Sequence, residues 1–446
     1  MGKVALHNPL NDRIFGAFVQ AEPVAGAPGA LHIIAAMVLY RLVFGLGLAA
    51  YAPYAFLRQA AGGRRIGDWK GRFGLSTLPV FHRSIWIHGV SVGEVNAART
   101  ILEALRREGA GPLVLSSSTA AGLASAAAVA TADGAIPFPL DLARPVERAL
   151  AAVDPSLVLL TETEIWPLFL ERCARRGVPV AIVNGRISSS SFARYRRAGR
   201  WLAPSLSRIA LFAMQTEEDA ARIAGLGVPE AKIRVTGNVK FDVPAEERPE
   251  VASRLRRLAA GRAVVIAGST HEGEEAAAIE AWAALDPRPL LVVAPRRPER
   301  FDEVFRRLRE SAGPAVRFSA AAGEPRAVLL DTVGDLASAF GAADAAFVGG
   351  TLADVGGHNP IEAWTKGVPT AIGPHVANIR TIAAEGAAAG AAIPVGSAAE
   401  LAAAWRTLLS DEAERRGRGA AALRLVESHR GAARRTALAV LALRKK

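Results

Sequence analysis

The sequence predicts an α/β protein built from two doubly wound, Rossmann-like domains, each with a parallel sheet covered by helices on both faces. Short apolar runs alternate with amphipathic helical patterns in two separate series, one beginning at Ser84 and the other at Ala263. Continuous apolar runs of this kind are typical of parallel strands that are buried on both faces. The length of 446 residues also favours two domains over one.

The first series begins with a strand at 84–88, a loop at 89–93 and an amphipathic helix at 94–107. Further strands are expected at 112–116, 156–160 and 179–183. Polar side chains follow the strands at their carboxyl ends, namely His88 and Glu94, Ser116 to Thr119, Glu162 and Glu164, and Asn184 and Arg186. Because ligands bind beyond the carboxyl ends of parallel strands, we expect one edge of this sheet to hold the chemistry.

A polar, proline-bearing stretch at 243–262 predicts a linker with a surface helix, and the second series follows it. Strands are expected at 263–267, 290–294, 327–331, 345–348 and 369–372, and terminal helices after Leu401. The predicted organisation is therefore a poorly ordered extension at 1–30, an apolar segment at 31–58, a first domain at 59–242, the linker at 243–262 and a second domain at 263–446. The loop edges of the two domains are expected to face a cleft.

The segment 349–363 is the most informative part of the second series. It follows the apolar run 345–348 and contains four glycines in nine positions, which leave the backbone free to curl and to point its N–H groups at a ligand. Asn359 is a good N-cap and Pro360 fits a first helical turn, so a helix should begin at Ile361. A strand, a glycine loop and a helix N-terminus together favour an anion site for a nucleotide. The alternative is a plain strand-to-helix turn that uses glycine for its geometry.

Composition restricts the other possibilities. A single cysteine, Cys173, excludes an intramolecular disulfide and a multi-cysteine metal site, and the eight histidines lack metal-ligand spacing. The net charge of +12 suits nucleic acid, an anionic membrane surface or a phosphorylated substrate. With only four tyrosines and no basic stretch interleaved with aromatic residues, the sequence does not favour nucleic acid as a partner.

The apolar segment from Leu31 to Leu57 is interrupted by His32 and Arg41 and is followed by a cluster of basic residues. A segment of this length can span or enter a bilayer, and the basic cluster would place the following domain in the cytoplasm. We therefore expect a membrane anchor or interfacial helix at 31–58. The alternative is a buried core helix.

Eight strings in chain order resemble one known family. They are HGVSVGE at 88–94, TETEIWP at 161–167, NGRIS at 184–188, TGNVKFD at 236–242, GSTHEGE at 268–274, PRRPER at 295–300, GGHNPIE at 356–362 and GPH at 373–375. On these strings the chain resembles the 3-deoxy-D-manno-octulosonic acid (Kdo) transferases of lipid A glycosylation.

This resemblance implies a GT-B fold and transfer of Kdo from CMP-Kdo to a lipid A precursor, in lipopolysaccharide biosynthesis at the cytoplasmic face of the inner membrane. It also implies that Glu94 is the catalytic base. A carboxylate at a helix start after a glycine-containing loop is rigidly placed for this role. The alternative is a carboxylate that only complements the helix dipole.

Other site residues fall into two groups. The acceptor group is Ser91, Glu162, Glu164, Arg186 and Lys240, whose alternatives are strand-end solvation and ordinary surface charge. The donor group is Ser269, Thr270, His271, Glu272, Arg296, Gly356, Gly357, His358, Asn359 and Glu362. Glu362 is expected to accept hydrogen bonds from the ribose, and Arg296 to pair with the phosphate or the Kdo carboxylate. His358 and His375 are more commonly structural hydrogen-bonding residues.

No cofactor and no metal are expected. CMP carries one phosphate, whose leaving charge a helix dipole and cationic side chains can stabilise, and no paired-aspartate motif indicates an essential metal. Two other readings stay open. One is another GT-B enzyme, such as a UDP-sugar transferase or a 2-epimerase. The other is a non-catalytic protein that binds anionic lipid or nucleic acid.

Overall fold

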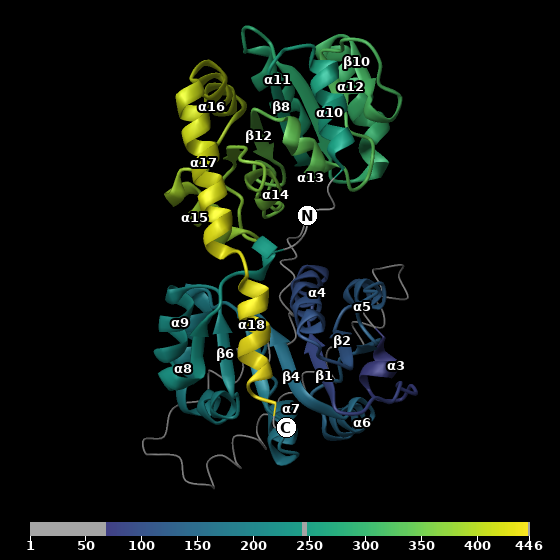
Figure 1. Cartoon of the computed structure of the whole chain (residues 1–446), viewed down its shortest axis with the longest axis vertical. Helices are drawn as coiled ribbons and strands as arrows, with labels where there is room; N and C mark the ends of the chain where they lie inside the picture. The colour runs from purple at the N-terminus through teal and green to yellow at the C-terminus, as the bar shows by residue number, and fades with distance from the viewer. Residues whose placement is uncertain (1–67, 243–247, 445–446) are drawn as a thin grey trace. The chain divides into compact units, whose positions relative to one another are not determined.

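The computed structural model describes residues 68–242 and 248–444, which form two compact units (Figure 1). The first unit contains residues 68–242 together with 429–444, and the second contains residues 248–428. Each unit has a seven-stranded sheet in which every paired strand is parallel. The predicted class of two doubly wound α/β domains is therefore confirmed.

The predicted extension at 1–30 and the apolar segment at 31–58 lie outside the described residues. Within 68–242 and 248–444, none of the helices combines the length and apolar character needed to cross a bilayer.

The first sheet has the strand order β3-β2-β1-β4-β5-β6-β7. Its strands are β1 (Ser84–His88), β2 (Leu113–Ser117), β3 (Gly134–Pro137), β4 (Pro155–Thr161), β5 (Val180–Gly185), β6 (Leu211–Met214) and β7 (Ile233–Val235). Its helices are α3 (Trp69–Arg72), α4 (Val92–Arg107), α5 (Ala120–Ala127), α6 (Ala143–Val153), α7 (Pro167–Arg175), α8 (Ser189–Ser207), α9 (Glu217–Ala224) and α18 (Ala432–Leu441), with short 3-10 turns at η1 (Glu230–Lys232) and η2 (Val239–Asp242).

Two apolar cores flank the first sheet. Side chains of α6, α7 and α8 pack with Trp86, Val158 and Phe212 of the strands. On the other face, α4, α5 and α18 pack against Ile85 and Leu115. Since every residue of β1, β2 and β5 is buried, these strands have the two-sided burial that their continuous apolar runs predict.

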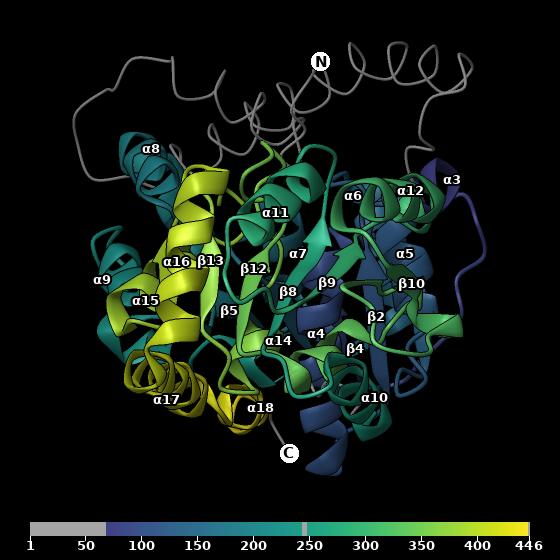
Figure 2. The same ribbon diagram turned by 90° about the horizontal axis from the view of Figure 1, so that it is seen from above.

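The second sheet has the strand order β10-β11-β9-β8-β12-β13-β14. Its strands are β8 (Val264–Thr270), β9 (Leu290–Pro295), β10 (Ala315–Arg317), β11 (Ala327–Leu329), β12 (Ala345–Val348), β13 (Thr370–Ile372) and β14 (Ala392–Pro394). The helices are α10 (Pro249–Ala259), α11 (Glu274–Ala283), α12 (Phe301–Ala312), α13 (Leu336–Ala339), α14 (Ile361–Trp364), α15 (Arg380–Ala389), α16 (Ala398–Ser410) and α17 (Glu412–His429), with 3-10 turns at η3 (Pro298–Arg300), η4 (Phe318–Ala320) and η5 (Phe340–Ala342). Figure 2 shows α11 and α12 on one side of the strands and α10 and α14 on the other, in agreement with the two cores.

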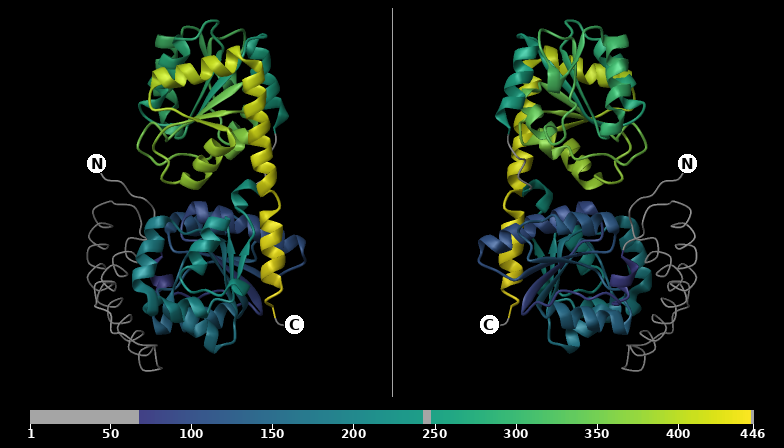
Figure 3. Two further views of the ribbon diagram at one scale, coloured as in Figure 1. Left: turned by 90° about the vertical axis from the view of Figure 1, so that its left-hand side faces the viewer. Right: turned by 90° about the vertical axis from the view of Figure 1, so that its right-hand side faces the viewer.

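The structure differs from the expected domain boundaries at two places. The helix expected within the linker at 243–262 is present as α10, but it belongs to the second unit, where its Val251, Leu255 and Leu258 are buried in the core. The last helix, α18, was expected to belong to the second domain. Instead it packs against α4 in the first unit, where Figure 3 shows it beside the strands, because its apolar side chains complete the core on that face.

Candidate functional site

Both sheets reverse their strand order beside their first strand. In the first sheet β1 lies between β2 and β4, and in the second β8 lies between β9 and β12. Doubly wound sheets bind ligands at this reversal, outside the carboxyl ends of the strands. The strings HGVSVGE and TETEIWP follow β1 and β4, and GSTHEGE and the glycine loop follow β8 and β12. The topology therefore brings the predicted residues of each unit to one edge of its sheet.

Glu94 is held at this edge by a capping box. Ser91 is the N-cap of α4, and its Oγ accepts a hydrogen bond from the Glu94 N–H at 3.3 Å. The Glu94 carboxylate accepts in return from the Ser91 hydroxyl at 3.0 Å and from the Val90 N–H at 2.9 Å. This is a variant of the S-x-x-E capping box at 91–94, in which the carboxylate binds the N–H of the residue before the N-cap and the N-cap hydroxyl, not the N-cap N–H. The Thr161 hydroxyl, at the end of β4, lies 3.5 Å from the same carboxylate.

The environment of Glu94 suits a base at neutral pH. Burial raises the pKa of Glu94 to about 7, and the negative charge of Glu162 adds to this rise. The Val90 N–H, the Ser91 hydroxyl and the charge of Arg186 act in the opposite direction. A carboxyl group with a pKa near the working pH is well matched to accept a proton from a hydroxyl group.

Glu162 and Arg186 form an ion pair beside Glu94. The Arg186 Nε lies 3.1 Å from a carboxylate oxygen of Glu162, whose charge raises the pKa of Arg186. The Thr163 hydroxyl donates to the backbone carbonyl of Arg186, which ties the loops after β4 and β5 together. Glu162 itself has a left-handed backbone, with φ of 57°, so the chain turns sharply directly after β4. The structure therefore brings together Ser91, Glu94, Glu162 and Arg186.

Glu164 and Lys240 lie in different surroundings. The charge of Glu164 acts on Arg72, a guanidinium whose pKa burial lowers to about 10. Arg72, which the sequence reasoning missed, donates to the carbonyl oxygens of Phe138 and Ser118 at 3.1 and 3.4 Å. Lys240 lies in η2, inside the string TGNVKFD. Much of that string anchors α18, because Asp242 accepts from the Gly431 and Ala433 N–H groups at 2.7 and 2.6 Å.

In the second unit, His271 and His358 contact each other. Their Nε2 atoms are 2.8 Å apart and their rings stack with a centroid distance of 5.1 Å, so one nitrogen donates and the other accepts. Burial lowers the pKa of His358 to about 4 and also lowers the pKa of His271. The pair is therefore neutral at pH 7, with a shared hydrogen bond joining the loops after β8 and β12.

Glu362 and Arg296 lie near this histidine pair. Burial raises the pKa of Glu362, and the charge of Arg296 opposes the rise. The charge of Arg296 also lowers the pKa of His358. Arg296, Glu272 and Asn359 are exposed, and Ser269, which has a φ of 56°, is half-buried. These residues are available to a ligand at the edge of the sheet.

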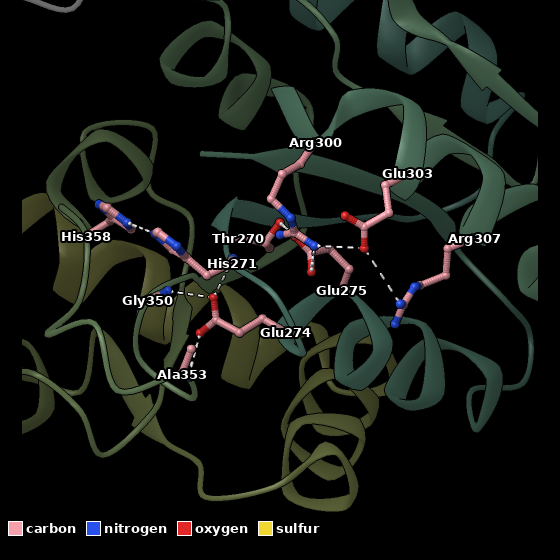
Figure 4. Close-up of polar contacts among 10 residues, drawn as sticks. All are labelled: Thr270, His271, Glu274, Glu275, Arg300, Glu303, Arg307, Gly350, Ala353 and His358. Carbon is pink, nitrogen blue, oxygen red and sulfur yellow. Dashed lines mark hydrogen bonds and ion pairs between the residues drawn. The ribbon is translucent and has the colours of Figure 1, made fainter. Parts of the chain in front are cut away.

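The glycine loop follows the predicted course with one important difference. The helix begins at Ile361, and Asn359 accepts from the Ile361 N–H at 3.1 Å, although Pro360 takes the N-cap position and the helix has only four residues. Gly356 and Gly357 have φ values of 101° and 85°, which only glycine adopts without strain. However, the N–H groups of residues 350–353 bind Glu274. Figure 4 shows this carboxylate under the loop, a role that we did not foresee.

Thr270 is also placed differently from the expectation. It is buried, and its hydroxyl donates to Glu275, which forms an ion pair with Arg300 at 2.6 Å (Figure 4). Its side chain therefore stabilises the base of the loop. Within the described residues, His, Cys, Asp and Glu side chains form no group of three or more that is arranged to hold a metal ion.

The fold is that of the two-domain GT-B class. The UDP-GlcNAc 2-epimerase from Neisseria meningitidis bound to UDP-GlcNAc is similar to this chain, with a TM-score of 0.53, 12% identity and coverage of 81% of this chain and 99% of that chain. The glycotransferase of kitacinnamycin has a TM-score of 0.51, 17% identity and the same coverage. Since one is an epimerase and the other a transferase, the likeness establishes the fold and leaves the reaction open.

Sequence comparison decides the family. A model described as 3-deoxy-D-manno-octulosonic-acid transferase (kdotransferase) matches residues 67–243. The 3-deoxy-D-manno-octulosonic acid transferase of Bordetella pertussis is 36% identical over 421 residues, which cover 89% of this chain and 97% of that protein. The chain therefore belongs to the Kdo transferase family and is a glycosyltransferase, as the resemblance in the sequence predicts.

Proposed function

We propose that this protein transfers Kdo from CMP-Kdo to a sugar hydroxyl of a lipid A precursor, with inversion at the anomeric carbon and with Glu94 as the base. The observation that supports this most is the placement of Glu94. It lies at the edge where the first sheet reverses its order, is fixed by Ser91 and Val90, and has a pKa of about 7.

The proposed reaction is a single displacement. The acceptor oxygen forms a bond to the anomeric carbon of Kdo, while the bond from that carbon to the phosphate oxygen of CMP breaks. The hydroxyl proton passes to the ionised Glu94, and the electron pair of the broken bond leaves with CMP. One carboxylate base is sufficient for this scheme, because no covalent sugar–enzyme intermediate is formed.

The acceptor and donor are assigned to different units. Glu162 and Arg186 lie beside Glu94 and are proposed to orient the acceptor. Arg296, His271, His358 and Glu362 are proposed to hold the nucleotide, with the positive charge of Arg296 offsetting the charge that develops on CMP. We further propose that the N-terminal apolar segment attaches the enzyme to the cytoplasmic face of the inner membrane, where the lipid acceptor lies.

The direct test is incubation of the protein with CMP-Kdo and a lipid A precursor, followed by mass spectrometry of the lipid. The lipid should gain the mass of one or more Kdo residues, and a chelator should leave the rate unchanged. CMP should compete with the donor, whereas UDP should not. No mass gain, or stronger competition by UDP than by CMP, would refute the proposed donor.

A further inference from the structure

The glycine loop after β12 has an internal anion where a nucleotide phosphate was expected. The backbone N–H groups of His271, Gly350, Thr351, Leu352 and Ala353 converge on the Glu274 carboxylate, and we call these five groups the loop amide cluster. The five N–O distances lie at 2.9, 2.7, 3.0, 2.9 and 3.1 Å, in that order. Glu274 is only 2% exposed, so this charge is almost fully enclosed.

The backbone can form this cluster because two glycines let the loop approach β8 closely. Gly349 lies against the carbonyl of Ser269, where a Cβ atom would collide with the oxygen. Gly350 has a φ of 71°, which turns the following N–H groups toward one point. Glu274 reaches that point from the first position of α11 (Figure 4).

Convergent backbone N–H groups bind phosphate as readily as carboxylate. The loop amide cluster also adjoins the proposed nucleotide site, because His271 gives its N–H to the cluster and its ring to the hydrogen bond with His358. Both Glu274 oxygens are already used, Oε1 by three N–H groups and Oε2 by two. A second phosphate on the nucleotide would find these N–H groups already bound to Glu274 and would be repelled by its negative charge.

We propose that Glu274 determines donor specificity by occupying the loop amide cluster, so that the site accepts nucleotides with one phosphate and disfavours those with two. This inference rests on the proposed function, because it concerns the same nucleotide site. Glu274 does not touch the reacting atoms in this scheme and is a specificity-determining residue. The charge of its carboxylate replaces that of the second phosphate of a nucleoside diphosphate.

The test compares the binding of CMP and CDP by calorimetry to the full chain and to Glu274→Ala. The wild-type protein should bind CDP at least about tenfold more weakly than CMP, because the additional phosphate has no partner. In Glu274→Ala the vacated N–H groups can bind that phosphate, so the ratio of the two affinities should move at least about tenfold toward CDP. Inorganic phosphate should raise the melting temperature of the variant more than that of the wild type.

The control is Glu280→Ala, which removes an exposed carboxylate from the same helix and should leave the ratio unchanged. Glu274→Gln serves where the alanine variant does not fold, because it keeps the size, removes the charge and should shift the ratio in the same direction. Equal binding of CMP and CDP by the wild type, or an unchanged ratio in a folded Glu274 variant, would overturn the inference. If the wild type binds no CMP, the proposed function fails, whereas the phosphate measurement still decides whether the vacated cluster binds an anion.

Discussion

At the scale of single residues, Glu94 combines a structural role at the start of α4 with the proposed role of the base. Its carboxylate accepts hydrogen bonds from the Ser91 hydroxyl and the Val90 N–H, which fix the side chain in one place. The same burial that makes this placement rigid raises its pKa to about 7. A base on a flexible side chain would lose part of its rate advantage to misorientation. The helix start therefore positions the group and also tunes it.

The first prediction concerns Glu94→Gln. Glutamine keeps the size and a hydrogen-bonding oxygen, so α4 should keep its start, but it cannot take a proton at neutral pH. Removal of a general base typically lowers the rate by about 10²–10⁴-fold. Kdo transfer should fall within this range, while CMP affinity measured by calorimetry should stay the same. Near wild-type turnover would move the base to another residue, with Glu162 and Glu164 the next to substitute.

A second prediction uses the two charges beside Glu94. Only the ionised carboxylate can accept a proton, so kcat/KM should rise with pH through the pKa of Glu94, near 7. Glu162→Gln removes the charge that raises this pKa and should move the rise to lower pH. Arg186→Gln removes the charge that lowers it and should move the rise to higher pH, each by up to about one pH unit.

Because the pH-profile midpoints of the two variants should move in opposite directions, an electrostatic effect on Glu94 can be distinguished from loss of a contact with the acceptor. Loss of an acceptor contact would raise KM in both variants without moving the midpoint of the pH profile. Midpoints that shift the same way, or that stay at the wild-type value, would contradict the assignment of the profile to Glu94.

A third prediction concerns Glu362 in the second unit. If its carboxylate accepts hydrogen bonds from the ribose, Glu362→Ala should weaken CMP binding by about tenfold to a hundredfold, since bonds to a charged group contribute roughly 1.5–3 kcal/mol. Calorimetry with CMP measures this directly. Glu299→Ala removes an exposed carboxylate from the same unit and should leave the affinity unchanged. Normal CMP affinity in a folded Glu362→Ala would place the ribose elsewhere.

At the scale of elements, the string TGNVKFD acts largely through α18. Asp242 accepts from the N–H groups of Gly431 and Ala433, and the hydroxyls of Thr236 and Thr436 lie 2.9 Å apart. The ring of Phe241 stacks on His429 just before α18. A string from which only Lys240 is predicted to bind the acceptor therefore also docks a helix from the far end of the chain.

Asp242→Ala provides the fourth prediction. Loss of a side chain that caps two helix N–H groups typically costs about 1–2 kcal/mol. Hydrogen exchange followed by mass spectrometry should show faster exchange in α18 and in the α4 segment that it covers. Exchange in the second unit and CMP affinity should be unchanged. The control is Glu310→Ala on the surface of α12, which should leave both the exchange rates and the CMP affinity unchanged. Protection of α18 at the wild-type level would contradict this capping role.

Most central strands could be predicted from the sequence, although the buried strand β6 was missed, and the edge strands could not be predicted. β1, β4, β5, β8, β9 and β12 have apolar runs because both of their faces are buried. The outer strands β3, β7 and β10 are short and partly exposed, so no such run marks them. Among the candidate site residues, the positions of Glu94 and of the glycine loop could be predicted from local sequence patterns. The contact between His271 and His358 and the burial of Glu274 under the loop depend on tertiary structure, which spacing does not encode.

At the scale of the whole molecule, the candidate site residues lie on two sheets that share one topological feature. Each sheet reverses its strand order beside its first strand and gathers polar residues there. The first unit gathers carboxylates and arginine beside Glu94, and the second gathers the histidine pair, Arg296 and Glu362. The proposed single displacement requires donor and acceptor to be bound at the same time, and a separate sheet edge for each would allow this.

The fifth prediction concerns the segment before residue 59, which lies outside the described residues. Its removal should leave a folded enzyme with normal CMP affinity, because the first sheet begins only at Ser84. Transfer to a lipid acceptor in membrane vesicles should fall much more than transfer to the same acceptor dispersed in detergent. A truncated protein that aggregates and no longer binds CMP would show that the segment belongs to a core.

The return of α18 to the first unit has a consequence for biosynthesis. Protein chains leave the ribosome from the N-terminus, and domains generally fold in that order. Here Ala433, Ala437 and Val440 complete an apolar face of the first unit, yet they are translated after the whole of the second unit. Until α18 is translated, α4 and α5 cover this face without the side chains of α18, whereas residues 248–428 are contiguous and can fold as they emerge. The first unit is therefore the first to be translated and the last to complete its apolar core.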